Sequence, residues 1–298
     1  MDLSSNKCSR AVRWRWLVAK VIDGEKPNHR MKTISLPLLL TWFQALDFPH
    51  KLGICERLFG SAIAPHGICW VQTAAGIPWK LDLANPTHRW IVYGKYEGAP
   101  FLTWAKKFLP RNGIVVDSGA NLGQMLLYIA QWVPQGKVIA FEPGTDAAAW
   151  LEECLVINST LPVEVLRFGL GALPAQLRLR NNGANYVHGA WSQISETEGE
   201  AIEIVRLADK LAERSIQTVD LWKLDVEGYE VPALQGAEEL LKEHRIRAIY
   251  AELSGENGQR VRDYLTKFGY SCYIFDRNGK LYVPSQLPSH TNGLFLPS

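Results

Sequence analysis

The chain has 298 residues, which is enough for one large or two modest domains. Hydrophobic residues make up 47% of it and charged residues 21%, which excludes a disordered or collagen-like chain. The net charge of +2 exerts no overall attraction on nucleic acid, so we predict no nucleic-acid partner. Residues 1–110 nevertheless carry 15 Lys and Arg against 7 Asp and Glu, while the remainder carries 17 against 23. This asymmetry predicts two regions with different roles.

The cysteines and the apolar segments indicate the compartment. The five cysteines are scattered and form no C-x-x-C pair, which argues against a disulfide framework or a zinc site and favours a reducing environment. No apolar run reaches the roughly 18–20 residues that span a bilayer. We therefore expect no transmembrane segment and a cytoplasmic location.

Residues 1–90 form a basic, tryptophan-rich N-terminal extension. Arginine and tryptophan interleave in Arg10–Lys20, a pattern typical either of a surface helix that tucks in its tryptophans or of contact with a membrane surface or anionic ligand. Thr33–Leu58 has an apolar helical pattern broken by prolines, and Gly67–Leu83 alternates apolar and polar residues around a turn. We expect a helical and β-hairpin cap that influences acceptor choice or partner contact.

Residues 91–298 alternate helices and strands. After a helix at Ala99–Phe108, we expect strands at 114–117, 137–142, 163–168, 219–225, 246–252 and 270–275, with helices at 145–157, 230–244 and 256–268. This rhythm predicts an α/β fold with a mostly parallel sheet and helices on both faces. Residues 171–207 interrupt it and are expected to form an inserted hairpin and loop.

The first strand ends in Asp117-Ser118-Gly119-Ala120-Asn121-Leu122-Gly123. Gly119 and Gly123 allow a tight turn and close approach to a ligand. Asp117 would repel a pyrophosphate but accepts hydrogen bonds from an ammonium group, directly or through water. Glu142-Pro143 ends the next strand, where an acid is placed to bind both ribose hydroxyls. An adenosine and an amino acid together predict S-adenosyl-L-methionine.

Lys223-Leu224-Asp225-Val226-Glu227-Gly228 ends the fourth expected strand, close to where a transferable methyl group would lie. A carboxylate there can orient or deprotonate an acceptor hydroxyl, or contribute with Glu252 to a divalent-metal site. A metal is possible here but is not predicted. Lys223, Asp225 and Glu227 are the candidate catalytic residues.

In their order and spacing, VVDSGANLG, AFEPG, LWKLDVEGYEVPALQGAEELL and IYAELSG resemble the FkbM family of S-adenosyl-L-methionine-dependent methyltransferases. The resemblance covers roughly residues 90–275 and implies a seven-stranded Rossmann-like class I methyltransferase fold. It also implies transfer to a hydroxyl of a sugar, polyketide or other small natural product. Ser118 stands where the family more usually has a hydrophobic residue.

The predicted cofactor site joins these motifs to two flanking segments. A segment upstream of the loop often closes over the methionine end in such folds, and the glycines after the third strand are expected to pass the adenine. The candidate cofactor-binding residues are Tyr96, Glu97, Asp117, Ser118, Gly119, Asn121, Gly123, Glu142, Pro143, Gly169 and Gly171.

Other readings stay open at this point. The inserted loop residues Asn185, Tyr186, His188 and Trp191 form either an acceptor lid or a surface hairpin. The chain is either an O-methyltransferase acting on a small molecule or glycan, an N-methyltransferase acting on a peptide, amine or RNA, or a non-catalytic binding or scaffold protein. A homodimer is possible.

Overall fold

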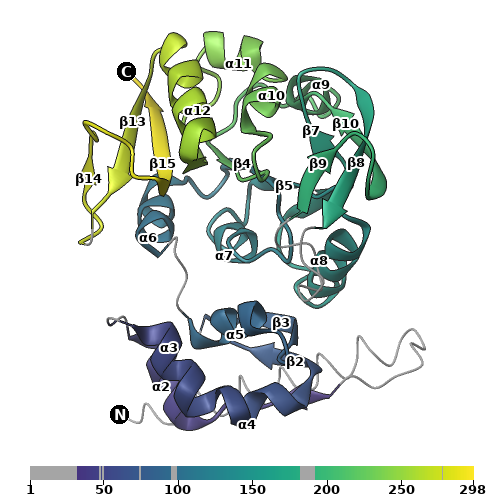
Figure 1. The fold of residues 1–298 in the computed structure, drawn as a ribbon, viewed down its shortest axis with the longest axis vertical. Coiled ribbons are helices and arrows are strands. Elements are labelled where there is room, and N and C mark those ends of the chain that lie inside the picture. The colour runs from purple at the N-terminus through teal and green to yellow at the C-terminus, as the bar shows by residue number, and fades with distance from the viewer. Residues whose placement is uncertain are drawn as a thin grey trace. The chain divides into compact units, whose positions relative to one another are not determined.

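The computed structural model describes residues 32–46, 48, 50–73, 75–94, 99–181, 192–276 and 278–298 (Figure 1). Two compact units divide the chain. The first holds the residues up to Lys95 together with Glu153–Ser159, and the second holds Tyr96–Glu152 and Thr160–Ser298. Tyr96, Glu97 and the loop residues Asn185, Tyr186, His188 and Trp191 lie outside the described residues.

The second unit is built on an eight-stranded sheet. Its strand order is β14 (Leu281–Tyr282), β13 (Tyr270–Phe275), β15 (His290–Pro297), β12 (Ile249–Ser254), β11 (Leu221–Leu224), β4 (Ile114–Ser118), β5 (Lys137–Phe141) and β6 (Val163–Leu166). Neighbours from β12 to β6 are parallel, whereas β15 is antiparallel to both β12 and β13. The predicted Rossmann-like, mostly parallel sheet is confirmed, with β14 as an additional short edge strand.

The central strands are apolar because both of their faces are covered. All four residues of β11 are buried, and so are the last four of β4 and of β5. Val116, Ile139 and Trp222 belong to one continuous core cluster. Figure 1 shows α6 (Ala99–Phe108), α7 (Leu126–Ala130) and the start of α8 (Thr145–Ile157) on one side of the sheet, with α10 (Glu230–Gln235), α11 (Glu238–Lys242) and α12 (Gly255–Lys267) on the other.

The single helix expected at 230–244 is two helices, α10 and α11. They separate at Gly236, where a Cβ would lie 2.1 Å from the carbonyl oxygen of Gly171. This close approach requires glycine and ends the first helix early. The sequence reading also missed α9 (Leu207–Ala212) and the reversed strand β15.

The interruption at 171–207 contributes to a separate four-stranded sheet. Its order is β7 (Gly169–Leu170), β10 (Glu200–Val205), β8 (Ala175–Asn181) and β9 (Ser192–Ser195). β8 is antiparallel to both β9 and β10, so the expected hairpin exists within a larger sheet. Leu179, Ile202 and Ile204 form its own small core.

The first unit confirms the β-hairpin, formed by β2 (Ile68–Gln72) and β3 (Pro78–Asp82), with β1 (Thr33–Ile34) parallel to β2. Its helical segments are α2 (Leu38–Ala45), α3 (Lys51–Cys55), η1 (Glu56–Gly60), α4 (Ser61–Ile63), η2 (Ala64–His66) and α5 (Pro86–Tyr93). The sequence reading missed α5, although Asn85 caps it by accepting a hydrogen bond from the Thr87 amide and Gly94 ends it in the left-handed region.

Buried polar groups tie the first unit together. The Arg89 guanidinium is bound to the Glu56 carboxylate and to the carbonyl oxygens of Leu83 and Ala84. Tyr93 also donates to Glu56, at 2.7 Å. These contacts hold the pKa of Glu56 below its usual value, mainly through the Arg89 hydrogen bond.

The helices of the described residues lack the combination of length and apolar sequence that is needed to span a membrane.

Candidate active site

The carboxyl ends of β4, β5, β11 and β12 meet at one edge of the large sheet. The chain order crosses over between β4 and β11, because β5 and β6 extend the sheet on one side of β4 while β11 and β12 extend it on the other. Such a crossover is where open α/β sheets bind ligands. The acids predicted from the sequence lie here: Asp117 on β4, Glu142 just after β5, Asp225 just after β11, and Glu252 on β12.

The loop after β4 runs through backbone conformations that favour glycine. Gly119, Asn121 and Gly123 have φ angles of 73°, 49° and 79°. A Cβ at Gly119 would lie 1.8 Å from the carbonyl oxygen of Asp225, so the loop packs directly against the end of β11. Only glycine fits this position.

A buried ion pair joins the two strands in the middle of the edge. Asp117 and Lys223 are register partners on β4 and β11, with 1% and 6% of their surfaces exposed. The Lys223 Nζ lies 3.1 Å from Asp117 Oδ1 and 3.3 Å from Asp225 Oδ2. Burial raises the pKa of Asp117, and the Lys223 ammonium offsets part of the rise.

Glu142 is held by backbone amides. Its Oε2 accepts a hydrogen bond from the Asn121 amide at 2.8 Å, and its Oε1 accepts one from the Gly144 amide at 2.9 Å. Each carboxylate oxygen keeps further acceptor capacity, as needed to bind two hydroxyl groups. Burial raises the pKa of Glu142 to about 7 despite these two amides.

The turn after β11 is shaped by a second buried acid. Glu227 has a φ angle of 52° and Gly228 one of 98°. Glu230 Oε1 accepts hydrogen bonds from the amides of Val226 and Gly228, at 3.1 and 3.2 Å. Glu230 is almost fully buried and is also bound by the Asn257 side chain. The hydrogen bonds to the Glu230 carboxylate therefore fix the conformation of the turn that carries Glu227.

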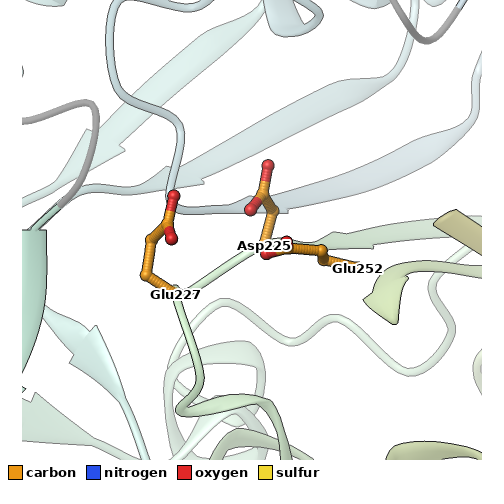
Figure 2. A group of neighbouring side chains, drawn as sticks. All are labelled: Asp225, Glu227 and Glu252. Atoms are coloured by element: carbon orange, nitrogen blue, oxygen red, sulfur yellow. The ribbon is translucent and has the colours of Figure 1, made fainter. Parts of the chain in front are cut away.

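Asp225, Glu227 and Glu252 come together at this edge (Figure 2). One oxygen from each carboxylate lies within 4.8 Å of the other two, and all three residues are half-buried. Burial, followed by the charges of Asp225 and Glu252, raises the pKa of Glu227 to about 8. Three carboxylates at this spacing suit a proton acceptor or a divalent cation.

Glu252 has two neighbours that the sequence reading missed. Ser254 Oγ donates to Glu252 Oε1 at 2.6 Å and lies 2.6 Å from His290 Nδ1. His290 begins β15, the strand that was not foreseen, so its position beside Ser254 was invisible in the sequence. Glu252 itself was detectable as an acid near a strand end.

Three predicted cofactor residues have structural partners of their own. The Ser118 hydroxyl accepts a hydrogen bond from the Trp222 indole at 2.8 Å inside the core, which accounts for a polar residue at this position. A Cβ at Gly169 or at Gly171 would lie 2.6 Å from the Ile204 side chain, so both glycines permit close packing on β10. Pro143 follows Glu142 and is half-buried.

The edge fits an adenosine-containing cofactor that carries an amino acid. Glu142 offers acceptors for ribose hydroxyls beside a loop that glycines bring close to the sheet. Asn121 Oδ1 is buried at this loop and lacks a hydrogen-bond partner within the described residues, which marks a place for a donor from a ligand. Together, the sheet order and this edge define a class I S-adenosyl-L-methionine-binding fold.

The chain belongs to the FkbM methyltransferase family. The family model described as "Methyltransferase FkbM domain" matches residues 117–272, just over half of the chain. The match begins at Asp117 and includes Glu142, Asp225, Glu227 and Glu252. Members of this family use S-adenosyl-L-methionine as the cofactor.

Curated methyltransferases are similar to just under half of the chain. Methyltransferase sdnD from Sordaria araneosa is 32% identical over an alignment of 162 residues, which covers 44% of this chain and 62% of that protein. The 31-O-demethyl-FK506 methyltransferase FkbM from Streptomyces tacrolimicus is 31% identical over an alignment of 175 residues, which covers 49% of this chain and 66% of that protein. The chain thus spans less than two thirds of either relative.

Similarity to solved structures is more distant. A precorrin-6y C5,15-methyltransferase from Geobacter metallireducens has a TM-score of 0.41 and 10% identity, with 67% of this chain and 87% of that chain covered. This similarity is too low to bear on function.

Proposed function

We propose that the protein transfers a methyl group from S-adenosyl-L-methionine to a hydroxyl of a small natural product or glycan. The observation that carries the proposal is the convergence of Asp225, Glu227 and Glu252 beside the glycine loop. Three carboxylates within reach of one another give an acceptor hydroxyl both a hydrogen-bond acceptor and a destination for its proton.

In this proposal Glu142 binds the ribose hydroxyls and Asn121 receives a donor from the cofactor. Asp117 meets the ammonium group through water, since its carboxylate already lies 3.1 Å from Lys223. Further proposed cofactor contacts are the loop backbone and the two segments that flank it. They comprise Ser118, Gly119, Gly123, Pro143, Gly169, Gly171 and, outside the described residues, Tyr96 and Glu97.

When bound, the cofactor supplies a methyl group made electrophilic by the positive sulfonium. Asp225 and Glu227 would orient the acceptor hydroxyl, and Glu227 would take its proton when the methyl group passes from the sulfonium to the acceptor oxygen. A carboxylate whose pKa is raised is the stronger base once it is ionised, which favours Glu227 for this step. Lys223 positions Asp225 and balances part of its charge.

The choice of oxygen as acceptor is supported by the name of one relative, the 31-O-demethyl-FK506 methyltransferase. We also propose that residues 1–90 influence the choice of acceptor and that the loop around 181–200, of which residues 182–191 lie outside the described residues, contributes to acceptor binding. A cytoplasmic location and a homodimer are also part of the proposal.

The proposal is tested by incubating the protein with labelled S-adenosyl-L-methionine and hydroxylated metabolites. We expect label on oxygen, and turnover lost in Asp225→Ala while calorimetry finds cofactor affinity within about threefold of wild type. Glu256→Ala, at an exposed acid near the site, is the matched control and keeps full activity. Full activity in Asp225→Ala contradicts the assignment.

Two further results separate the alternatives. Label on nitrogen makes the protein an N-methyltransferase, and failure to bind the cofactor in calorimetry makes it a binding or scaffold protein. Turnover that survives exhaustive chelation is expected if the acids act on protons. Loss of turnover that Mg²⁺ restores would assign them to a cation instead.

A further inference from the structure

Helix α2 in the first unit presents an exposed apolar face. Leu38 is 84% exposed and Trp42 is 74% exposed, while Leu39 and Leu46 are more than half exposed. Leu38 and Trp42 are four residues apart, so they share one side of the helix, and Leu46 directly follows the last helical residue. A cluster of large apolar side chains on a surface marks an interaction site.

The orientation of α2 is set by contacts on its other side. Leu40 is fully buried, and the buried Gln44 side chain donates a hydrogen bond to the Val92 carbonyl oxygen. The Phe43 ring packs edge-on against Phe59 at a centroid distance of 5.7 Å. The exposed face therefore cannot turn inward without breaking buried contacts.

The following helical segment repeats the pattern. Ile54 and Leu58, four residues apart, are both exposed, and the exposed Arg57 lies between them in sequence. Apolar side chains with a basic residue among them are typical of surfaces that lie against lipid.

The sequence next to this face is cationic. Residues 1–31 contain seven Lys and Arg against three acids, and the chain then passes through Lys32 to reach Leu38 six residues later. The Arg- and Trp-rich stretch Arg10–Lys20 lies within this segment. In the sequence, positive charge therefore lies next to the segment that carries the apolar face.

Each acid of the same unit that the structure describes already has a hydrogen-bond or ion-pair partner. Among its described residues the acids are Glu56, bound to Arg89, Asp82, which accepts from the Ala84 amide, and Glu153, bound to Lys80 at 2.7 Å. If the cationic segment folded over α2, these acids would have little capacity left to balance its charge. An external anionic surface supplies that balance.

We propose that the α2 face docks on an anionic phospholipid surface. Leu38, Leu39, Trp42 and Leu46 enter the interfacial layer, where tryptophan is favoured, and the cationic segment binds the headgroups. Each basic residue near such a surface adds to binding, and salt weakens that contribution. Docking through this face would place the protein at a membrane in which an apolar methyl acceptor can dissolve.

The test is co-sedimentation of the full chain with vesicles of phosphatidylcholine alone or mixed with phosphatidylglycerol. We expect binding to the mixed vesicles at about 0.15 M salt and release at about 1 M salt. The double variant Leu39→Gln/Trp42→Gln should bind at least about tenfold more weakly. Leu173→Gln, at a side chain 71% exposed in the second unit, is the matched control and should bind as wild type does.

Circular dichroism and cofactor calorimetry confirm that both variants are folded. Equal binding by the double variant and the wild type overturns the proposal, and so does equal binding to both vesicle types. If the wild-type protein does not bind vesicles, two other results identify what covers the face and overturn the proposal. Light scattering that finds a dimer for the wild type and a monomer for the double variant shows that the face joins two copies of the chain. A lower urea midpoint for the double variant shows that another part of the same chain covers the face.

Discussion

The two halves of the sheet edge treat their carboxylates differently. On the β4–β5 side each acid has a partner, since Asp117 lies against Lys223 and Glu142 accepts hydrogen bonds from two backbone amides. On the β11–β12 side, Asp225, Glu227 and Glu252 crowd together, although Asp225 also contacts Lys223 and Glu252 accepts a hydrogen bond from Ser254. Burial and mutual repulsion raise the pKa of Glu227 to about 8 there.

This difference between the carboxylates indicates that the two halves of the sheet edge bind their ligands in different ways. The first half is organised in advance, so a neutral ribose can bind with little rearrangement. The second half concentrates negative charge that a hydroxyl proton or a cation relieves. Lys223 lies between the halves and contacts an acid in each. Four substitutions test this contrast.

The largest effect is expected on turnover in Glu227→Gln. Removing the proposed proton acceptor should lower kcat about a hundred- to ten-thousandfold, because the amide cannot take the acceptor proton. Cofactor affinity, measured by calorimetry, should stay within about threefold because Glu142 and the loop are untouched. Glu256→Gln serves as the control. A comparable loss of cofactor affinity would mean that the two halves are not separate.

Lys223→Met should destabilise the fold by about 3–5 kcal/mol at pH 8, since it leaves the buried Asp117 carboxylate without its cation. Removing Lys223 raises the pKa of Asp117 further, so the lost stability should return as the pH falls and Asp117 takes a proton. The double variant Lys223→Met/Asp117→Asn should recover most of the loss in urea unfolding. No recovery would mean that Lys223 acts through packing alone.

Gly119→Ala should reduce the free energy of unfolding by about 2–3 kcal/mol, because its Cβ meets the Asp225 carbonyl and its φ is positive. Gly228→Ala is the matched comparison. Its φ is also positive, but nothing lies within 4 Å of the added Cβ, so the cost should be about 1 kcal/mol. Equal costs in urea unfolding would argue against the close approach of the two halves.

The smallest effect concerns Glu142 and pH. Ribose hydroxyls donate to the ionised carboxylate, so binding favours the deprotonated form of a group whose pKa is about 7. Affinity should therefore rise as pH increases through about 7 and level off above it. Adenosine is the probe, since it lacks the amine of the full cofactor. Glu142→Gln should bind adenosine about tenfold more weakly with no such pH dependence. A pH profile unchanged from wild type would assign the titration to another group.

Several elements could be predicted because they depend on local pattern. Helix Ala99–Phe108, helix Thr145–Ile157 and strand Tyr270–Phe275 have the bounds expected from periodicity and turn residues. The convergence of Asp225 with Glu252 also follows from pattern, since parallel strands place their carboxyl ends together. The predicted loop glycines Gly119 and Gly123 do adopt positive φ angles.

What could not be predicted depends on contacts between distant segments. β15 lies between β12 and β13, and no local pattern specifies which strands a C-terminal segment will join. The break at Gly236 arises from the main chain of Gly171, and the Ser118 hydroxyl bonds to Trp222 from a different strand. Each of these features depends on a contact between separate segments of the chain that forms only in the folded state.

The sequence by itself determined the alternation of strands and helices, the acids at the strand ends and the membership of the FkbM family. Those properties reside in short segments, where spacing and residue type suffice. Only the tertiary structure decided that Lys223 pairs with Asp117, that Glu142 is held by two amides and that Glu227 is crowded by other acids. The charge state of a buried group depends on every neighbour that the fold brings to it, and several of those neighbours, such as Lys223 for Asp117 and Glu252 for Glu227, come from separate strands.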